Sequence, residues 1–470
     1  MKTVLRKIWL SPITLPVLTI TFFTFFSRFL GFVRQYLILR NLTEIDSDLL
    51  LSANKIPETI SVVLLMGTIY SSVLPIASRI ESKDRNEENL SSYLNLITLS
   101  LVLLIGVLSV LGIIFTPQLL QLTWFTSPKI WVIAQQKNLV DDYILASRIL
   151  FLFPLTFAVQ AIWGVFITLK KRFLVYSLAG VITNLGAIVA LLVSDGSFVK
   201  VAFGMVWGAA LSSLLFLYIC FRDDFKPPHF SFGWFRDKYA QFKVDIWQTW
   251  KLFLPRVLVI DGFYAANLLI NSISTKQGQI TAFDIGNSIQ GAFFIIVTSF
   301  GTVLFPDLSK TFHSSKTDRN YFWKKTKQYL WLSAGLGVLV TLVTLVGSPL
   351  IVNLFKILGQ KQDNNDLIIQ VAQLTSISLI FRAVREILVR YIYIRERVWQ
   401  PLILSTISVV AVVLVTFVAN FMKIDAALSA SLGFIAYNIV WVILALIIFQ
   451  KDFMEERQGK DLVVVENDNA

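Results

Sequence analysis

Long apolar runs recur from one end of the chain to the other, separated by short polar segments. Each run is about 20 residues or longer, which is enough for a helix to cross the roughly 30 Å hydrocarbon core of a bilayer. The pattern therefore predicts an all-α, polytopic integral membrane protein with about twelve transmembrane helices. The predicted spans are residues 15–39, 49–76, 93–115, 143–169, 173–193, 198–221, 252–273, 280–304, 329–354, 367–394, 398–421 and 424–449.

The composition supports this class. Of the 470 residues, 55% are hydrophobic and 15% are charged, and the mean hydropathy is +0.68, whereas soluble domains carry about 25% charged residues. Lys2, Arg6 and Lys7 precede the first apolar run, and no small-residue cleavage site follows it, so we expect an uncleaved first span. The single cysteine, Cys220, excludes an internal disulfide and a cysteine-based metal site.

The basic residues sort to one side of the predicted membrane. If the N-terminus is placed inside, the inside segments hold 27 of the 42 Lys and Arg residues and the outside segments hold 8. Cytoplasmic loops carry the excess of basic residues in membrane proteins, so both termini are predicted to be cytoplasmic. These loops also account for the net charge of +12, and we expect no nucleic-acid partner.

The longest polar segment divides the chain into two halves. We predict an N-terminal six-helix bundle at residues 1–221, a basic amphipathic cytoplasmic connector at 222–251, a C-terminal six-helix bundle at 252–450 and a polar cytoplasmic tail at 451–470. The connector is aromatic as well as basic, which is typical of a helix that lies on anionic lipid.

The two halves are similar to each other in sequence. Gly67 and Pro75 toward the end of the second span match Gly301 at the end of the eighth span and Pro306 just after it. Each half has an even number of spans, so the two repeats are related by an axis along the membrane normal. This architecture is typical of transporters, and it predicts a substrate site in a central cavity between the halves, with alternating access by rocking.

Seven basic residues lie within predicted spans, where a charge costs about 2.5–3.5 kcal/mol on insertion scales. Arg382 is four residues before Glu386, which is four before Arg390, so these three share a helical face and are predicted to neutralise one another. Arg28 lies near the middle of the first span, with no acidic residue within helical reach. The seven are Arg28, Arg34, Lys55, Arg148, Arg256, Arg382 and Arg385.

Three of these cations make the first two spans the candidate site. Arg28 and Arg34 are six positions apart, about 9 Å of rise and 120° of rotation on a helix, so both can border a wide cavity. Lys55 comes from the second span and is flanked by Asp48 and Glu58. Cations in an apolar bundle predict an anionic ligand, and the guanidinium fork of arginine suits phosphate.

Sequence motifs for enzymatic chemistry are absent. There is no Gly-rich phosphate loop of the ATPase kind, and no DxxxD or HExxH cluster falls in a span. We therefore expect a transporter rather than an enzyme, with no cofactor and no metal site. Asp261, Asp284 and Asn271 are candidates to bind a coupling ion.

Short motifs in chain order carry a family resemblance. They are Arg28-x-x-Gly31-x-x-Arg34, Asp48, Lys55-x-Pro57, Lys171-Arg172-Phe173, Asn184, Leu254-Pro255, Asn267-Leu-Leu-Ile-Asn271 and the segment from Gly301 to Lys310. Together they resemble the MurJ (MviN) lipid II flippases, within the multidrug/oligosaccharidyl-lipid/polysaccharide exporter superfamily. The resemblance implies a carrier of a polyprenyl-pyrophosphate-linked precursor for peptidoglycan, which it moves from the inner to the outer leaflet of a bacterial cytoplasmic membrane. A cationic cavity would hold the pyrophosphate.

The chain departs from the family pattern at two cavity positions. Where the family has an arginine shortly after the position of Pro57, this chain has Ser61, and the family's eighth-span arginine falls on Asn287. We expect Lys55 and Arg256 to compensate for these losses. Family members typically have fourteen spans, whereas twelve are predicted here. The predicted substrate-binding residues are Arg28, Arg34, Lys55, Arg256, Asp48 and Asn287.

Three functional hypotheses remain open at this point. The first is a flippase for a lipid II-like substrate, and the second is an exporter of another lipid-linked anionic glycan of the O-antigen or teichoic-acid type. The third is a non-transporting membrane scaffold whose partners are cell-wall synthesis enzymes. Neutralising Arg28 and Arg34 separates the first two hypotheses from the third, because a scaffold has no need of charges in the bilayer.

Overall fold

The computed structural model describes residues 14–65, 68–84, 87–121, 128–170, 172–223, 225–226, 231–257, 259, 261–314, 319–360, 362–395, 397 and 399–457. Over these residues every regular element is a helix and no strand forms. The prediction of an all-α membrane protein is confirmed, since the described residues include nine helical segments long and apolar enough to cross a bilayer. The chain divides into two compact units.

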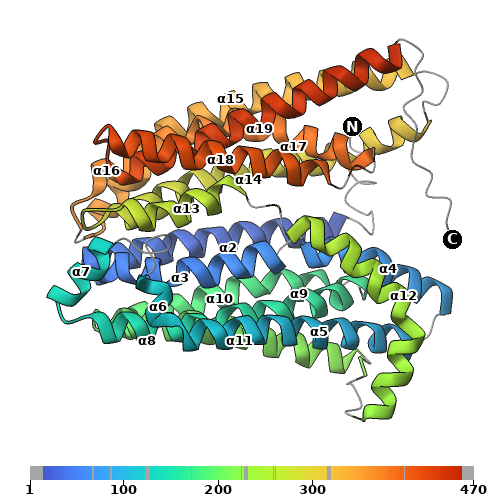
Figure 1. Ribbon diagram of the computed structural model, residues 1–470, viewed down its shortest axis with the longest axis horizontal. Coiled ribbons are helices and arrows are strands. Elements are labelled where there is room, and N and C mark those ends of the chain that lie inside the picture. Colours follow the sequence, from blue (N-terminus) through green and yellow to red (C-terminus); the bar gives the residue numbers. More distant parts are fainter. Residues whose placement is uncertain are drawn as a thin grey trace. The chain divides into compact units, whose positions relative to one another are not determined.

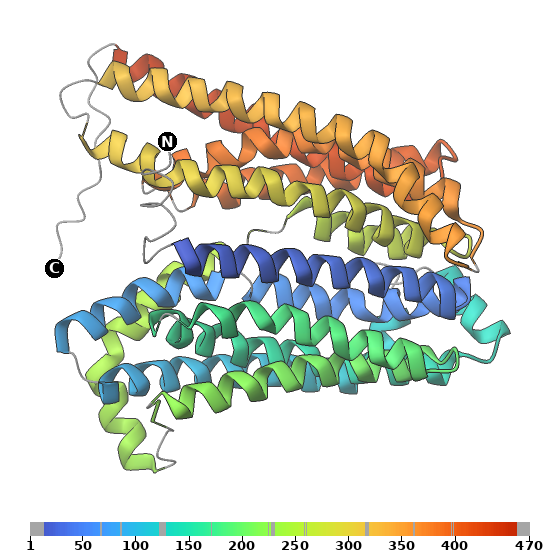
Figure 2. The ribbon, with the colours of Figure 1, turned by 180° about the vertical axis from the view of Figure 1, so that it is seen from behind.

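Unit 1 comprises Met1–Val257 and Gly359–Gln362. Most of its longer helices run alongside one another, while α12 crosses one end of the unit and α7 lies at the opposite end (Figures 1 and 2). Its helices are α2 (Thr14–Asn41), α3 (Glu44–Leu65), α4 (Thr68–Asp84), α5 (Glu87–Ile114), α6 (Thr116–Gln121), α7 (Pro128–Gln136), α8 (Val140–Leu150), α9 (Phe153–Leu169), α10 (Phe173–Val193), α11 (Phe198–Arg222) and α12 (Phe232–Val257).

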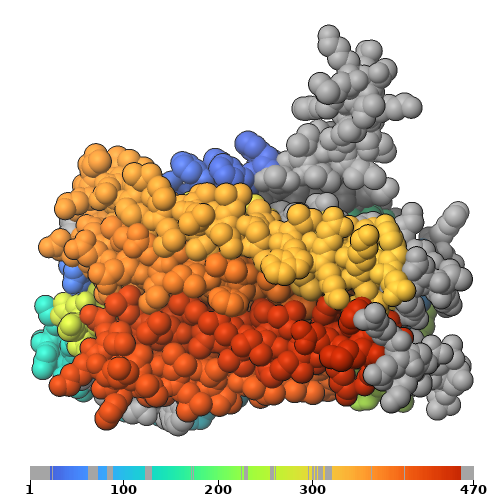
Figure 3. Space-filling model, turned by 90° about the horizontal axis from the view of Figure 1, so that it is seen from above, coloured from blue at the N-terminus to red at the C-terminus, as the bar shows by residue number. Residues whose placement is uncertain are grey.

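Unit 2 comprises Leu258–Leu358 and Asp363–Ala470. The space-filling view shows α15 and α19 on one face of this unit (Figure 3). Both helices expose large apolar side chains, such as Leu342 and Val346 of α15 and Ile447 of α19, as a surface against lipid tails requires. The helices of unit 2 are α13 (Gly262–Ile273), α14 (Gln279–Ser314), α15 (Arg319–Ile357), α16 (Asn365–Ser376), α17 (Ser378–Ile394), α18 (Gln400–Phe421) and α19 (Ala426–Arg457).

Nine of the twelve predicted spans match a described helical segment that is long and apolar enough to cross a bilayer. The other three predicted spans do not. The span at 15–39 coincides with α2, but part of α2 has no described side chains. The span at 49–76 is covered by α3 and α4. The span at 252–273 is not one helix: α12 ends at Val257 and α13 begins after Asp261, whose side chain accepts a hydrogen bond from the Phe263 N–H and so caps the new helix.

The internal repeat is visible in where helices break. The fourth predicted span of each half consists of two helices separated by a very short turn, α8 and α9 in unit 1 and α16 and α17 in unit 2. The next two helices of each half are joined by a loop with a left-handed residue, Asp195 at φ 49° in unit 1 and Lys423 at φ 64° in unit 2. The two halves therefore share local geometry as well as the sequence motifs.

Small residues allow the paired helices of each repeat to approach closely. A Cβ on Gly186 of α10 would overlap the backbone of Gly204 and Gly208 of α11. In unit 2, a Cβ on Gly433 of α19 would overlap the side chain of Thr416 of α18. Lipid gives helices no hydrophobic reason to associate, so close backbone packing of this kind supplies the dispersion energy that holds such pairs.

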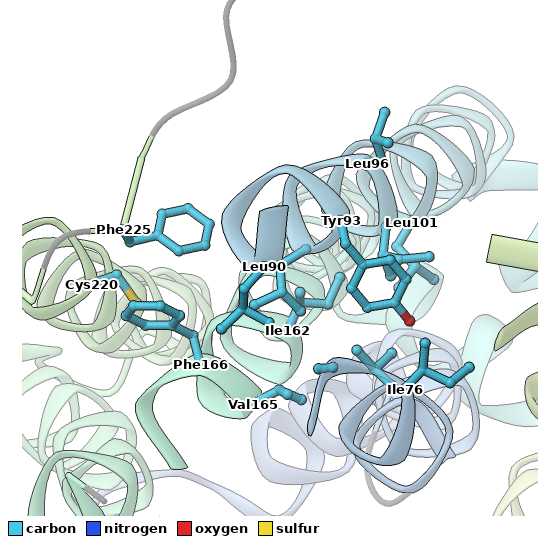
Figure 4. Close-up of a cluster of buried hydrophobic side chains, with 14 of the residues drawn as sticks. Ile76, Leu90, Tyr93, Leu96, Leu101, Ile162, Val165, Phe166, Cys220 and Phe225 are labelled. Atoms are coloured by element: carbon cyan, nitrogen blue, oxygen red, sulfur yellow. The ribbon is translucent and has the colours of Figure 1, made fainter. Parts of the chain in front are cut away.

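The cytoplasmic end predicted for unit 1 has its own apolar core, drawn in Figure 4. Tyr93 of α5 and Phe166 of α9 are fully buried there, with Phe225 from the segment after α11. The hydroxyl of Tyr93 lies 2.6 Å from that of Thr249, and Arg79 of α4 donates to Asp245 at 2.6 Å, so α12 is held by both apolar and polar contacts.

The opposite face of α12 is basic and aromatic. Its exposed side chains include Phe232, Arg236, Tyr239, Lys243, Trp247 and Lys251, and the acidic Asp237 is exposed as well. This composition fits the predicted contact with anionic lipid, which stays a prediction, as does the four-part division of the chain at residues 221, 251 and 450.

Candidate functional site

The two arginines of the first span lie on different faces of α2. Asn184 of α10 donates to the Ser27 carbonyl at 3.1 Å, and Asn41 donates to the Leu191 carbonyl at 2.7 Å. Ser27, Arg34 and Asn41 are spaced by seven residues, so Arg34 belongs to the stripe of α2 that faces α10. Arg28 is rotated by about 120° from Arg34 and is exposed.

Neither arginine is neutralised within the part of the chain that the structure describes. Arg28 makes no hydrogen bond or ion pair with a described residue. The Nε atom of half-buried Arg34 is shielded from solvent and has no hydrogen-bond partner among these residues. Between them, a Cβ on Gly31 would meet no atom within 4 Å, so this side of α2 is open. An unpaired guanidinium is costly in lipid, and a ligand that supplies negative oxygens would offset that cost.

Lys55 has a different environment from the two arginines. Only 1% of its surface and none of the surface of Asp48 is exposed. The two residues are seven positions apart on one face of α3, and neither lacks an interaction partner. Ser52 on the same helix lies 2.7 Å from the hydroxyl of Tyr143 of α8. Lys55 therefore lies inside unit 1, whereas Arg28 lies at its surface, and their joint role in a site stays a prediction.

The two positions that depart from the family pattern are both buried. The hydroxyl of Ser61 donates to the Pro57 carbonyl at 2.8 Å, one turn back on α3. Asn287 of α14 donates to the Phe283 carbonyl at 2.8 Å, and its Oδ1 atom has no partner among the described residues. Arg256, predicted to compensate, lies in the last turn of α12, but its side chain falls outside the described residues.

Unit 2 contains a charged cluster on α17, part of which the sequence predicts to be self-neutralising. Glu386 and Arg390 of α17 form the predicted ion pair. Arg385, for which the sequence predicted no partner, pairs with Asp261 at 2.6 Å, and its guanidinium lies over the rings of Tyr437 and Trp441.

Arg382 differs from the prediction that it pairs along its own helix. It donates to Gln290 of α14 at 3.1 Å, and its Cζ atom lies 3.4 Å from the centre of the Phe294 ring. The sequence did not predict Gln290 as the partner of Arg382. A polar residue in the middle of an apolar span, one turn after Asn287, was the available signal for it.

The three residues predicted as candidates for an ion site differ in their bonding partners. The carboxylate of Asp261 accepts a hydrogen bond from the Phe263 N–H and forms an ion pair with Arg385, so both of its oxygens have partners. Asn271 is fully buried, and neither atom of its amide has a partner in the described part of the chain. Asp284 does not lack a partner. Among the described residues, no three His, Cys, Asp or Glu side chains are placed to hold a metal ion.

The structure also contains an apolar groove of about 660 Å³ along α15, which includes none of the predicted site residues. Its lining residues are Gln328, Trp331, Leu332, Gly335, Leu336 and Leu339. Trp331 is 79% exposed, so the groove lies at the surface of unit 2.

Comparison with known families and structures gives a consistent result. The family model described as "Lipid II flippase MurJ" matches residues 43–460. No curated protein matches the chain.

Solved structures of membrane transporters share the fold. "Lipid II flippase MurJ, inward closed conformation" is 18% identical, with 93% of this chain and 89% of that chain covered at a TM-score of 0.65. An inward-facing multidrug resistance transporter of the MATE family, MOP superfamily, is 12% identical, with 92% and 96% covered at 0.73. A MOP superfamily transporter from Pyrococcus furiosus is 12% identical, with 94% and 96% covered at 0.61. At these identities the likeness concerns the fold alone.

Proposed function

We propose, on the premise that this chain belongs to the lipid II flippase MurJ family, that it carries a lipid II-like precursor from the inner to the outer leaflet by alternating access. The membership makes the chain a membrane transporter for peptidoglycan synthesis and not an enzyme. The bacterial cytoplasmic membrane, with both chain termini on its cytoplasmic side, is the location we infer from the family and from the distribution of basic residues.

The observation that carries this proposal is the state of Arg28 and Arg34. Both lie on a helix packed into unit 1, and neither forms an ion pair with a residue that the structure describes. A pyrophosphate group supplies two negative phosphates whose oxygens match the guanidinium fork. Charges kept unpaired in a bilayer at a cost of about 2.5–3.5 kcal/mol each are better explained by a ligand than by packing.

Complementation of a flippase-depleted bacterium tests this role. We expect that the wild-type chain restores growth and that Arg28→Ala and Arg34→Ala do not, although both variants reach the membrane in normal amounts. Arg40→Ala is the matched control: it removes a charge from the same helix, but Arg40 is exposed and donates to Tyr36 at 3.1 Å. Growth restored equally by all three variants would contradict the proposal.

A second candidate function is the export of another lipid-linked glycan, of the O-antigen or teichoic-acid type. It is favoured by Ser61 and Asn287, which stand where the family pattern has arginines. The two candidate functions can be separated by reconstituting the chain in vesicles and measuring how fast it moves lipid II and, in parallel, a lipid-linked glycan that carries no peptide. Faster movement of lipid II supports the first function, and faster movement of the other lipid supports the second.

A further inference from the structure

The region around Arg382 in unit 2 holds more positive than negative charge. Three arginines of α17, Arg382, Arg385 and Arg390, lie near two carboxylates. Asp261 is bonded to Arg385, and Glu386 is bonded to Arg390. Arg382 forms no ion pair with any described residue, so one guanidinium charge has no carboxylate bonded to it.

Aromatic rings hold this guanidinium in place. Its Cζ atom is 3.4 Å from the ring centre of Phe294 on α14 and 5.5 Å from that of Phe434 on α19. The Nη1 atom donates to Oε1 of Gln290 at 3.1 Å. Contacts with ring faces stabilise a cation without occupying its N–H groups, so the remaining donors stay available.

Two donors at this place are buried and unpaired within the described structure. They are Nε of Arg382 and Nε2 of Gln290, and only 1% of Gln290 is exposed. A buried donor without a partner costs about 1–3 kcal/mol, and more when it is charged. Adjacent donors on a net positive group select an acceptor with negative charge rather than a metal ion.

The neighbouring surface of α14 leaves room for such a ligand. Asn287, Gln290, Gly291 and Phe294 are spaced by three or four residues and so share one face of the helix. A Cβ on Gly291 would meet no atom within 4 Å. The open space therefore adjoins the residue that carries one of the two unpaired donors.

We propose that Arg382 and Gln290 form an oxyanion-binding site in unit 2 that takes a phosphate of the lipid-linked diphosphate cargo. This inference rests on the proposed function for the identity of the cargo, but not for the existence of the site. The family's arginine on this face of α14 is replaced by the amide of Asn287. Arg382 of α17 brings a guanidinium to the same face of α14.

Binding of inorganic pyrophosphate to the purified full chain in detergent tests the site. The measurement is made in an Arg28→Ala/Arg34→Ala background, which removes the contribution proposed for unit 1. We expect Arg382→Met to weaken pyrophosphate binding about tenfold or more, the loss of one charge-assisted hydrogen bond. Arg382→Lys should recover part of this affinity. Arg148→Met, which removes an exposed charge from unit 1, should change it less than about twofold.

A second variant guards against misfolding. If Arg382→Met does not fold, Gln290→Leu removes the other donor, and we expect about fivefold weaker binding for a neutral donor. Unchanged pyrophosphate affinity in the folded variant, or no binding by the background chain, overturns the site.

A parallel arm with phosphatidylglycerol in mixed micelles identifies the source of the phosphate. If Arg382→Met weakens binding of phosphatidylglycerol but not of pyrophosphate, the assignment of the site to the cargo is overturned. If the variant weakens binding of pyrophosphate, the assignment is supported.

Transport separates this proposal from the proposed function. If the wild-type chain moves lipid II in vesicles while Arg382→Met binds pyrophosphate as well as its parent does, the site fails and the flippase function stands. If Arg382→Met loses pyrophosphate binding while the wild-type chain moves no lipid II, the site stands and the flippase function fails.

Discussion

Two arginines one turn apart on α17 have opposite surroundings. Arg385 donates to Asp261 at 2.6 Å and lies over Tyr437 and Trp441. Arg382 lies against the rings of Phe294 and Phe434 and donates only to the neutral amide of Gln290 within the described structure. The first charge is balanced within the fold, and the second is not. Arg28 and Arg34 of unit 1 resemble Arg382 in this respect.

The difference distinguishes two uses of charge in a bilayer. A guanidinium bonded to a carboxylate links helices, as Arg385 links α17 to the start of α13, and its removal leaves the partner charge exposed to apolar surroundings. A guanidinium without a carboxylate adds little to stability, because its desolvation is not offset. We therefore expect stability to depend on the paired arginines and function to depend on the unpaired ones.

The largest effect on stability is expected at Asp452 of α19, a carboxylate with three bonded or ion-paired partners among the described residues. It accepts hydrogen bonds from Tyr391 at 2.7 Å and from Arg397 at 2.9 Å, and it lies 3.8 Å from Arg395. Asp452→Ala should lower the free energy of unfolding by about 3–5 kcal/mol, since it leaves buried Arg395 with one carboxylate fewer. Thermal and denaturant unfolding in detergent measures this.

A control on the same helix sharpens this result. Glu455 pairs with Lys451 four residues away at 3.8 Å, and the lysine side chain is 72% exposed. Glu455→Ala should cost less than about 0.5 kcal/mol. Equal losses of unfolding free energy in Asp452→Ala and Glu455→Ala would show that burial of an ion pair does not determine how much it contributes to stability.

The next effect is expected for the Arg385 pair. Asp261→Ala removes both the ion pair and the cap of α13, and about 3 kcal/mol should be lost. This is the lower end of the range for a broken buried pair, since the Asp261 side chain is 32% exposed. Asp261→Ala/Arg385→Met should be more stable than Asp261→Ala alone, because Arg385 no longer remains as a guanidinium that has lost its carboxylate. If the double variant loses the sum of both single losses, the two residues are not coupled.

A smaller effect is expected for Arg382. Arg382→Met keeps much of the side-chain volume against Phe294 and removes a charge with no bonded carboxylate. Its free energy of unfolding should change by less than about 1 kcal/mol in either direction. A loss as large as that of Asp261→Ala, measured in the same detergent, would remove the distinction between the two arginines.

The smallest effect concerns an ion pair outside the membrane-spanning helices, in which the Arg172 side chain is 50% exposed and that of Asp223 is 10% exposed. The hydrogen bond from Arg172 at 2.7 Å lowers the pKa of the Asp223 carboxyl below its ordinary value. The stabilisation is complete above the unfolded-state pKa of about 3.9 and is lost as the pH falls through the lower folded-state pKa. Between pH 5 and pH 2 the melting temperature of Asp223→Asn should therefore fall slightly less than that of the wild type. Identical pH profiles would contradict this linkage.

Local patterns in the sequence predicted the helices and the nearest ion pair. Apolar runs of sufficient length predicted the membrane fold, and the spacing of Glu386 and Arg390 predicted their bond, because both depend on neighbours along one helix. The bond of Arg385 to Asp261 joins residues 124 positions apart, and no periodicity indicates it. The break between α12 and α13 was missed because the apolar run continues through it, although Pro255 and Asp261 mark it in the sequence.

The candidate site was predicted less fully than the fold. Arg28 and Arg34 follow from charges in an apolar run, and the structure leaves both without a described ion pair. Arg382 was assigned to a self-neutralising face because its sequence neighbours include Glu386. Its true environment depends on how α17 packs against α14 and α19, which is tertiary information.

The most direct test of the central claim measures the leaflet in which labelled lipid II lies, in vesicles that contain the purified chain. A membrane-impermeant reagent reports the accessible fraction over time. The account predicts that the wild-type chain exposes the inner-leaflet lipid II and that Arg28→Ala leaves it protected, as in protein-free vesicles. Equal rates for the wild type and Arg28→Ala, or no exposure by the wild type, would contradict it.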